Sequence, residues 1–357
     1  MSKFHVKLLC MFFLILPAVS IAQHIDTTKG LKDYYKKYFP IGVSVSPASL
    51  NNSAEATLIS KQFNSITPEN AMKMGAIHPE QNRYNWRGAD EIVNFAQDHH
   101  LRVRGHNLCW HENTPKWLFY DKDGKVVSKD TLLQRLKDHI YTVVKRYKGK
   151  VYAWDVVNEA VSDKSDEFLR NSLWYQICGE DFIFKAFQYA HEADPDAILF
   201  YNDYGTERPA KREKVYQLLK KLVDAHIPVG AVGLQAHWSI NDPTEKELIE
   251  SIERFSSLGI KIQITELDMS VYPSERTPVD DNGYTPAIAE KQSQQYEMVF
   301  KIFRKYKDVI TGVTFWNISD RSSWLNNFPI KGRKNYPLLF DDNLHPKPAY
   351  WRVIAIK

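Results

Sequence analysis

The sequence predicts a single (β/α)8 TIM barrel, and three observations lead to that fold. Short runs rich in β-branched and aromatic residues alternate with longer runs that carry apolar residues at intervals of three and four. Eight such β-rich runs occur, and strict alternation of strands with helices favours a parallel sheet that eight units can close. No Gly-rich phosphate loop follows a predicted strand, which disfavours the doubly wound open sheet that is the main alternative.

The predicted elements cover the chain from residue 41 onward. No Ser/Pro/Gly-rich linker and no internal repeat divides the chain after residue 22, so one domain is predicted over residues 23–357. Helical periodicity is found, among other places, in residues 87–99, 130–147, 208–226, 243–257 and 287–307. The predicted strands are residues 41–45, 63–67, 101–107, 151–157, 197–201, 231–235, 261–265 and 310–315.

Residues 1–22 are predicted to be a secretory signal peptide that is cleaved after Ala22. Lys3 and Lys7 come before an apolar run that Pro17 interrupts, and small residues stand at the end of the segment. A membrane anchor is the alternative, but the run is shorter than the roughly 20 apolar residues that a span requires. We therefore expect a secreted or periplasmic protein whose mature chain has no membrane span.

The composition is that of a globular protein with little net charge, since 43% of the residues are hydrophobic and 25% are charged. Removal of residues 1–22, which hold two lysines and no acid, lowers the formal net charge from +4 to +2. So small a charge predicts no nucleic-acid partner. Only Cys109 and Cys178 remain after cleavage, too few for a disulfide framework, so the core must supply the stability. We expect a monomer.

Seven of the eight predicted strands end in polar or aromatic residues, and in such a barrel the C-terminal ends of the strands form the active site. Any one of these residues could be a helix cap. The fourth strand, however, ends in Asn158 and Glu159, and burial without partners would cost about 1 to 3 kcal/mol for the amide and more for the acid. In strand order from the second to the eighth, the residues are Glu69, Asn70 and Lys73; His106, Trp110 and His111; Asn158 and Glu159; Asn202 and Tyr204; Gln235 and His237; Glu266 and Asp268; and Trp316.

Two carboxylates across the mouth of a barrel, here Glu159 and Glu266, suit glycoside hydrolysis. One carboxylic acid protonates the leaving oxygen, while the other carboxylate stabilises or attacks the anomeric carbon. Tryptophans supply flat apolar faces for sugar rings. Asn158 could reach a sugar 2-hydroxyl, where hydrogen bonds strengthen in the transition state.

The ordered motifs of the chain resemble those of glycoside hydrolase family 10, the endo-1,4-β-xylanases. The resemblance covers nearly all of the chain after residue 22. Any one motif is weak, but the ordered set is specific. In chain order the motifs are ITPENAMK, RGHNLCWH, WDVVNEA, LFYNDYG, GLQAHW, ITELD and FWNISDRSSW.

The resemblance implies a retaining enzyme that acts on xylan and xylo-oligosaccharides without a cofactor or metal. It implies Glu159 as acid/base and Glu266 as nucleophile, with His237 hydrogen-bonded to the nucleophile and Asp268 orienting that histidine. It also implies sugar contacts, which are His106, Trp110, Asn158, Gln235 and Trp316 around the sugar that is cleaved; Glu69, Asn70, Lys73 and Trp324 around the next xylose on the non-reducing side; Tyr204 on the leaving-group side; and Asn113 at a distal subsite.

The chain departs from the usual family pattern at three positions, none of which touches a proposed catalytic carboxylate. Asn107 stands where many members have Thr, Asn113 where many have Gln, and Asn317 where Gly is frequent.

Two other functions stay open from the sequence. One is a related barrel glycosidase that acts mainly on β-glucan. The other is a catalytically silent carbohydrate-binding barrel, which would be expected to have lost a carboxylate.

Overall fold

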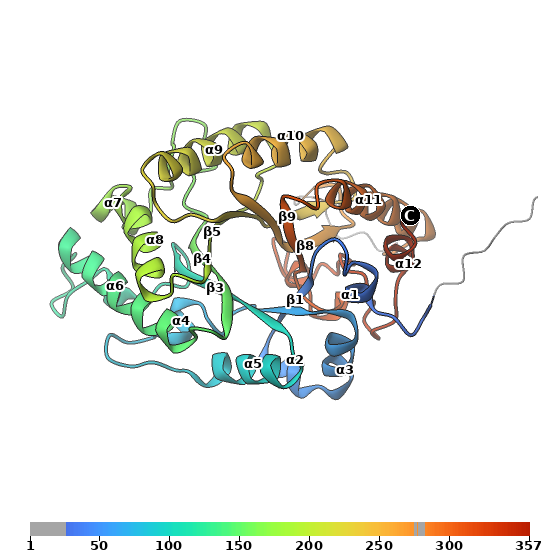
Figure 1. Ribbon diagram of the computed structural model, residues 1–357, viewed down its shortest axis with the longest axis horizontal. Coiled ribbons are helices and arrows are strands. Elements are labelled where there is room, and N and C mark those ends of the chain that lie inside the picture. Colours follow the sequence, from blue (N-terminus) through green and yellow to red (C-terminus); the bar gives the residue numbers. More distant parts are fainter. Residues whose placement is uncertain (1–25, 275–276, 278–282) are drawn as a thin grey trace, which may run out of the picture.

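In the part of the chain that the computed structural model describes, nine strands form one parallel barrel, which helices surround (Figure 1). The structure describes residues 26–274, 277 and 283–357, so the predicted signal peptide lies outside the described residues. The strand order is β6-β5-β4-β3-β2-β1-β9-β8-β7, and a further pairing of β6 with β8 closes the sheet. Strand β7 also pairs with β8. Nine strands thus fill eight positions, which confirms the predicted (β/α)8 barrel and excludes the open sheet.

The elements follow the predicted alternation, with more helices than the periodicity named. The strands are β1 Ile41–Val45, β2 Ser65–Pro68, β3 Arg102–Trp110, β4 Val151–Asn158, β5 Ile198–Asp203, β6 Ala231–Leu234, β7 His237–Ser239, β8 Lys261–Ser270 and β9 Ile310–Phe315. The helices are α1 Leu31–Tyr34, α2 Pro47–Asn51, α3 Ser53–Gln62, α4 Met74–Ile77, α5 Arg87–Asp98, α6 Lys129–Arg146, α7 Leu173–Cys178, α8 Asp181–Ala193, α9 Pro209–Asp224, α10 Glu245–Ser256, α11 Pro286–Lys305 and α12 Pro348–Ile354, with short 3-10 turns η1 Lys116–Leu118, η2 Asp320–Ser322 and η3 Trp324–Asn326.

Strands β3 and β8 run at least three residues further than the sequence predicts, while the ends of the other strands differ by two residues or fewer. Strand β3 continues to Trp110 because Trp110 still pairs with Asn158 of β4. Strand β8 continues to Ser270 because β7 supplies a parallel partner, with His237 opposite Asp268. The predicted ends at residues 107 and 265 are therefore wrong, since residues beyond them still pair with a neighbouring strand.

Side-chain caps and prolines begin most of the long helices. Ser128 and Thr285 accept a hydrogen bond from the third residue of α6 and α11, and Asn52 does the same for α3. Thr244 and Glu247 form a reciprocal capping box at the start of α10. Each of these caps supplies an acceptor for a backbone N–H of the first helical turn, which has no partner within the helix.

A buried ion pair lies inside the barrel, close to the proposed site. Arg104 of β3 and Asp155 of β4 are both fully buried and form a two-pronged contact, and the Arg104 guanidinium lies 4.7 Å from the ring centroid of Phe200. The same Asp155 carboxylate is 2.8 Å from Nδ1 of His106. Loss of one partner from such a pair leaves a buried charge and costs about 3 to 5 kcal/mol. The pair thus fixes the position of His106.

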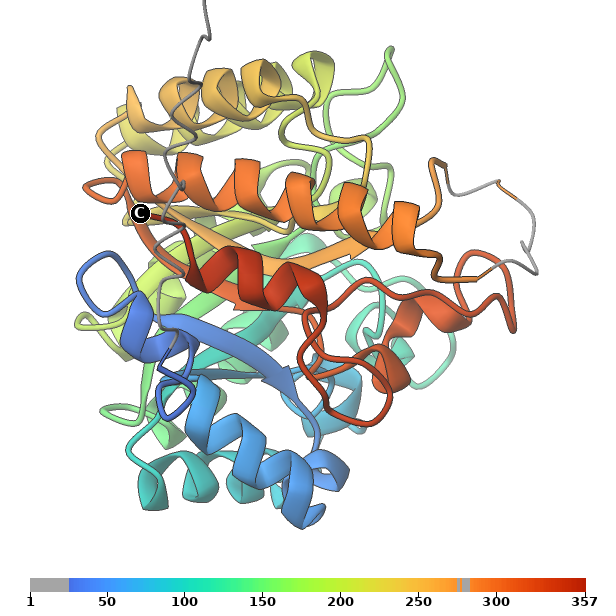
Figure 2. The same cartoon turned by 90° about the vertical axis from the view of Figure 1, so that its right-hand side faces the viewer.

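The C-terminal helix completes the outer layer. Helix α12 packs beside α11, as the side view in Figure 2 shows. The hydroxyl of Tyr35, just after α1, donates to the carbonyl of Val353 in α12 at 2.8 Å, which joins the first and last helices of the described chain. Within the described ranges, no helix combines the length and apolar character that crossing a membrane requires.

Two histidines form a buried pair between the loop after β2 and helix α6. The Nδ1 atoms of His78 and His139 are 3.1 Å apart, and Nε2 of His78 is 3.1 Å from the carbonyl of Gln81. If both rings are neutral, His78 donates to Gln81 and accepts from His139. The Nε2 atom of His139 is then buried without a partner. A proton added there would have no acceptor. Accordingly, burial and then the neighbouring His78 lower the pKa of His139 to about 3. Burial also lowers the pKa of His78, although the hydrogen bond to Gln81 and then the charge of Asp138 oppose the shift.

This pair predicts a loss of stability in acid. A histidine whose pKa is lowered on folding contributes stability that is present above the unfolded pKa of about 6.5 and is lost as the pH falls. His139→Gln should therefore flatten the fall of unfolding free energy between pH 6.5 and pH 4 by up to about 1.4 kcal/mol per pH unit. Urea unfolding at several pH values measures this slope. The exposed His226, replaced in the same way, is the control. Equal slopes in His139→Gln and the wild type would contradict the prediction.

Candidate active site

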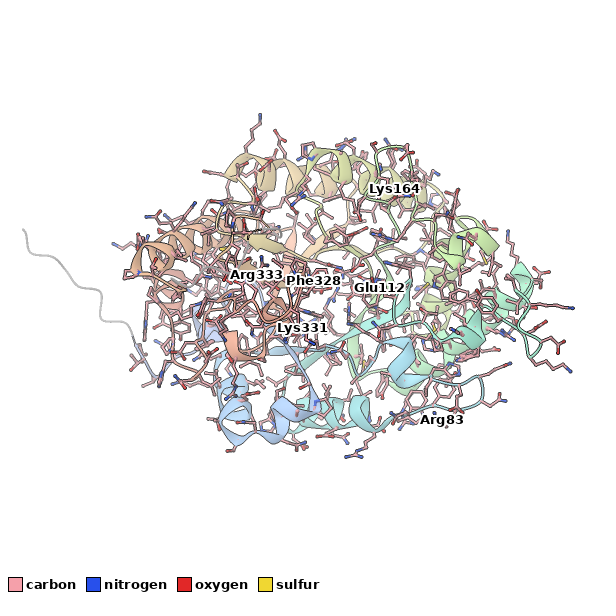
Figure 3. The ribbon with its side chains drawn as sticks, turned by 180° about the vertical axis from the view of Figure 1, so that it is seen from behind. Arg83, Glu112, Lys164, Phe328, Lys331 and Arg333 are labelled. Atoms are coloured by element: carbon pink, nitrogen blue, oxygen red, sulfur yellow. The ribbon has the colours of Figure 1, made fainter. Side chains whose placement is uncertain are left out.

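Most of the side chains that the sequence predicts for the site gather at the C-terminal ends of the strands. Figure 3 views the ring of helices from behind, and the residues that it labels include Glu112 after β3, Lys164 after β4 and Phe328 after β9. The two predicted carboxylates, Glu159 and Glu266, come from β4 and β8, which are separated by β5 and β6 in the barrel.

The backbone of Glu159 turns sharply where β4 ends. Its φ angle is +55°, a left-handed conformation that residues other than glycine seldom adopt. The turn is held from both sides, because the Glu159 N–H donates to the Asn202 carbonyl at 2.9 Å and the Glu159 carbonyl accepts from Nε of Arg170 at 3.1 Å. Strain of this kind persists only where its surroundings enforce it and concentrates at functional sites.

Three neutral donors hold the Glu159 carboxylate. Its Oε1 atom accepts from the amides of Gln235, at 2.9 Å, and Asn158, at 3.1 Å. Its Oε2 atom accepts from the Trp110 indole at 2.9 Å. Burial nevertheless raises the pKa of Glu159, and these hydrogen bonds only partly oppose the shift. The protonated form is thus favoured relative to an exposed glutamate.

The Glu266 carboxylate lies inside β8 and is only 4% exposed. Its Oε1 atom accepts from the Asn202 amide at 2.8 Å and is 4.0 Å from Nδ1 of His106, while its Oε2 atom is 3.3 Å from Nε2 of His237. Burial alone would raise its pKa. The interactions with His106, His237 and Asn202 outweigh burial and lower the pKa to about 2. Glu266 is therefore ionised at neutral pH.

His237 is held as a doubly protonated ring between two carboxylates. Its Nδ1 atom is 3.0 Å from Oδ2 of Asp268, and its Nε2 atom faces Glu266. Burial disfavours the charged ring, but the charge and hydrogen bond of Asp268, followed by those of Glu266, raise the pKa of His237 to about 10. Both nitrogens then donate, so Asp268 fixes the orientation of the ring that supports Glu266.

A chain of amides connects the two glutamates. Asn202 donates to both Glu266 and Oδ1 of Asn158, at 2.8 Å each, and Gln235 donates to Glu159 and to the same Oδ1 atom, the latter at 3.2 Å. One carboxyl group with a raised pKa and one with a lowered pKa are in this way fixed in a single network. Two carboxyl groups whose pKa values are shifted in opposite directions can divide the roles of general acid and nucleophile.

Four further residues lie at the side of the site formed by the loops after β2 and β9. Lys73 Nζ donates to Oδ1 of Asn70 at 2.9 Å and lies 5.0 Å from the Trp110 ring centroid. Trp324 donates its indole N–H to Oδ2 of Asp268 at 2.7 Å. Glu69 approaches from the β2 side, where burial raises its pKa. Lys73 and Trp324 thus contact two other residues of the candidate site, Trp110 and Asp268.

The structure places Trp316 inside the site and Tyr204 beside it. The Trp316 ring meets His106 edge to face, with centroids 5.3 Å apart. The Tyr204 hydroxyl accepts from Arg170 at 2.9 Å, and the same Arg170 holds the Glu159 carbonyl. Tyr204 is thus joined to the proposed acid rather than to Glu266.

Asn113 is joined to the site only indirectly. Its side chain is exposed, its φ angle is +48°, and its carbonyl accepts from the Gly75 N–H at 2.7 Å. Asn adopts such a left-handed conformation more readily than Gln does. Another departure from the family pattern, Asn107, is 1% exposed, and its amide lies 3.4 Å from Nε2 of His106.

Comparison with known proteins identifies the family. The model of glycosyl hydrolase family 10 matches residues 30–356. The chain belongs to glycosyl hydrolase family 10. It is 49% identical over 327 residues to an endo-1,4-beta-xylanase of Geobacillus stearothermophilus, covering 92% of this chain and 98% of that protein. It is 49% identical over 352 residues to a beta-1,4-xylanase of Dictyoglomus thermophilum, covering 96% of each. The crystal structure of a Paenibacillus barcinonensis xylanase superposes with a TM-score of 0.89 at 46% identity, covering 91% of this chain and 98% of that one.

Several contacts of this family 10 site escape prediction from sequence. Arg170 holds the Glu159 carbonyl from a position 11 residues later, and Asn317 donates to Glu69 across 248 residues of sequence. Phe328 is 51% exposed, and its ring stacks on Trp324 with centroids 5.1 Å apart. An aromatic residue beside the FWNISDRSSW motif is a weak signal for Phe328.

The described residues contain no group of three or more His, Cys, Asp or Glu side chains arranged to hold a metal ion.

Proposed function

We propose that this family 10 chain is an endo-1,4-β-xylanase that hydrolyses internal xylosidic bonds with retention of configuration. The observation that carries the proposal is the pair Glu159 and Glu266, whose pKa values move in opposite directions within one hydrogen-bonded network. A catalytically silent carbohydrate-binding barrel would not need two carboxyl groups with pKa values shifted in opposite directions. The xylanase names of the relatives favour xylan over β-glucan.

In this proposal Glu266 is the nucleophile and Glu159 is the acid/base. Ionised Glu266 attacks the anomeric carbon, while protonated Glu159 donates to the leaving oxygen. Once the glycosyl-enzyme forms, the charge of Glu266 is consumed, and Glu159 is then the base that activates water. His237, oriented by Asp268, supports the ionised nucleophile, and Asn158 is placed for a sugar 2-hydroxyl.

The remaining residues form subsites on the two sides of the scissile bond. Tyr204, on the Glu159 side, is assigned to the leaving-group side, and the exposed Asn113 to a distal subsite. The sugar that is cleaved is surrounded by His106, Trp110, Asn158, Gln235 and Trp316. The next xylose on the non-reducing side is held by Glu69, Asn70, Lys73 and Trp324. No cofactor or metal takes part in this scheme.

A product profile tests the proposed function. Xylan and short xylo-oligosaccharides are digested, the early products are separated by chromatography, and the first anomer is identified by NMR. We expect a range of xylo-oligosaccharides, a β-configured first product and little release from carboxymethylcellulose. Greater release of sugar from carboxymethylcellulose than from xylan, or an α-configured first product, would contradict the proposal.

Lys73→Ala tests the assignment of the subsite on the non-reducing side. A xylose lacks the hydroxymethyl group of glucose, so a tight subsite can accept xylose and exclude glucose by crowding. Loss of one charged hydrogen-bond donor should lower kcat/KM on xylan roughly 10- to 100-fold. An activated aryl xyloside does not fill this subsite and should lose far less. Lys122→Ala, at an exposed turn, is the control. Equal losses on both substrates would count against the assignment.

We also propose that the chain is exported and acts as a monomer without a nucleic-acid partner. Lys3 and Lys7, followed by an apolar run and small residues, support cleavage after Ala22. N-terminal sequencing of the protein recovered outside the cytoplasm should begin at Gln23, and light scattering should give the mass of one mature chain. An intact Met1 on the recovered protein would reject the cleavage.

A further inference from the structure

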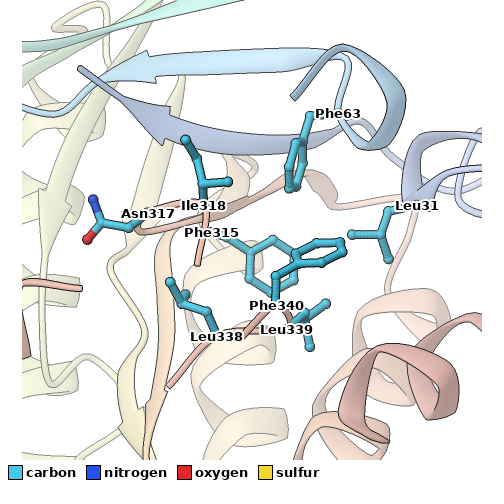
Figure 4. A pocket seen from close by; sticks show the side chains of 8 residues that line it. All are labelled: Leu31, Phe63, Phe315, Asn317, Ile318, Leu338, Leu339 and Phe340. Atoms are coloured by element: carbon cyan, nitrogen blue, oxygen red, sulfur yellow. The ribbon is translucent and has the colours of Figure 1, made fainter. Parts of the chain in front are cut away.

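Asn317 follows Trp316 directly after β9, and its backbone is held in an unusual conformation. Its φ angle is +94°, and its N–H donates to Oγ of Ser44 in β1 at 2.8 Å. Figure 4 shows that the Asn317 side chain points away from the apolar residues around it, which include Phe315 and Ile318. A positive φ angle suits glycine best and asparagine next among the ordinary residues.

The Asn317 amide reaches a residue of the proposed subsite. Its Nδ2 atom donates to Oε2 of Glu69 at 3.0 Å. Burial raises the pKa of Glu69. The hydrogen bond from Asn317 is the strongest influence against that shift, followed by the charge of Lys73. The bond thus favours the ionised carboxylate and fixes one of its oxygens, so that Oε1 can accept from a sugar hydroxyl.

The other half of the amide is a cost to the fold. Asn317 is 5% exposed, and its Oδ1 atom is buried without a hydrogen-bond partner. A buried unsatisfied carbonyl lowers stability. Glycine would avoid that cost and would also fit the φ angle of +94° better. Stability of the fold therefore gives no reason for an asparagine here, whereas the contact with Glu69 does.

We propose that Asn317 is a positioning residue, which orients Glu69 and thereby sets the affinity for the second xylose on the non-reducing side. It acts through Glu69 and does not itself touch the sugar. This inference rests on the proposed function, because it assigns Glu69 to a xylose subsite. It adds to that function a residue whose replacement by glycine should lower the preference for the longer substrate without lowering the stability of the fold.

Two chromogenic substrates isolate the effect, since p-nitrophenyl β-xylobioside differs from p-nitrophenyl β-xyloside by one sugar on the non-reducing side. We expect Asn317→Gly to reduce the advantage of the xylobioside, as a ratio of kcat/KM values, by about tenfold. The loss should lie mostly in KM and should grow as the pH falls from 7 to 5, because Glu69 then protonates more readily. The melting temperature should stay the same or rise.

Three further variants make the test decisive. Asn317→Asp keeps the shape but replaces the donor by an acceptor, so it should lose the same selectivity at pH 7. In a Glu69→Gln background, Asn317→Gly should cost little more, because the two residues act as one unit. His226→Gly, at an exposed position with a φ angle of +54°, controls for a glycine in a left-handed turn.

Some outcomes overturn this inference and leave the proposed function intact. They are an unchanged ratio of kcat/KM values in Asn317→Gly, whether both substrates lose activity equally or neither does, and full additivity with Glu69→Gln. If the wild-type enzyme hydrolyses neither substrate, the proposed function itself fails. The two failures are therefore distinguishable in a single set of measurements.

Discussion

Replacement of Glu266 by alanine is expected to abolish turnover on xylan and on activated aryl xylosides alike. The side chain is 4% exposed and is ionised, with a pKa of about 2 set by His106, His237 and Asn202. No leaving group, however good, supplies the missing bond to the anomeric carbon. The loss should be on the order of 10⁴-fold or more, as when the nucleophile of other covalent enzymes is removed. Initial rates on both substrates measure it.

A matched variant separates lost chemistry from lost folding. Glu55 of α3 is also a buried glutamate, at 6% exposure, but its partner is Arg321 outside the proposed subsites. Glu55→Ala should lower stability and leave kcat of the folded enzyme nearly unchanged. If Glu266→Ala kept its activity on an activated aryl xyloside, or if azide restored a β-configured product in it, Glu266 could not be the nucleophile.

The barrel could be predicted because its strands and helices carry distinct periodicities. The sequence did not predict that one position of the barrel is filled by two short strands, β6 and β7. The break between β6 and β7 lies at Gln235 and Ala236, where Ala236 has a φ angle of +63°. No sequence rule predicts a left-handed alanine, which the surrounding barrel must enforce. The same break allows His237 to pair with Asp268. A local irregularity thus creates the geometry that supports Glu266.

The candidate site, like the barrel, could be predicted from the sequence only in part. Glu159 and Glu266 could be predicted, because the ends of parallel strands meet at one end of a barrel and both residues follow recognisable motifs. The residues that set their pKa values and backbone conformation act through contacts between distant segments, as Asn202 does by donating to Glu266 across 64 residues of sequence. Asn202 was visible as a strand-end residue, but its bond to Glu266 depends on three-dimensional packing. Arg170 gave no such signal, and Asn317 was visible as a departure from the family pattern but not as a contact of Glu69.

Glu159→Ala is expected to separate the two halves of the reaction. The first half needs a proton for a poor leaving group, which burial prepares by raising the pKa of Glu159. Turnover of xylan should therefore fall by on the order of 10²- to 10⁴-fold, the usual contribution of general acid–base catalysis. An aryl xyloside whose leaving group needs no proton should still form the glycosyl-enzyme on Glu266, giving a burst of product followed by a slow steady rate.

Added azide should accelerate this slow phase, because azide needs no base and can replace the water that Glu159 no longer activates. It would enter from the face that Glu159 occupied, so the product should be a β-glycosyl azide, visible by NMR. Gln235→Ala is a useful comparison, since it removes a donor at 2.9 Å from the Glu159 carboxylate but leaves the acid itself in place. That variant should lose activity without gaining any response to azide. An α-configured azide product from Glu159→Ala would require attack from the opposite face, and the roles of the two glutamates would then have to be exchanged.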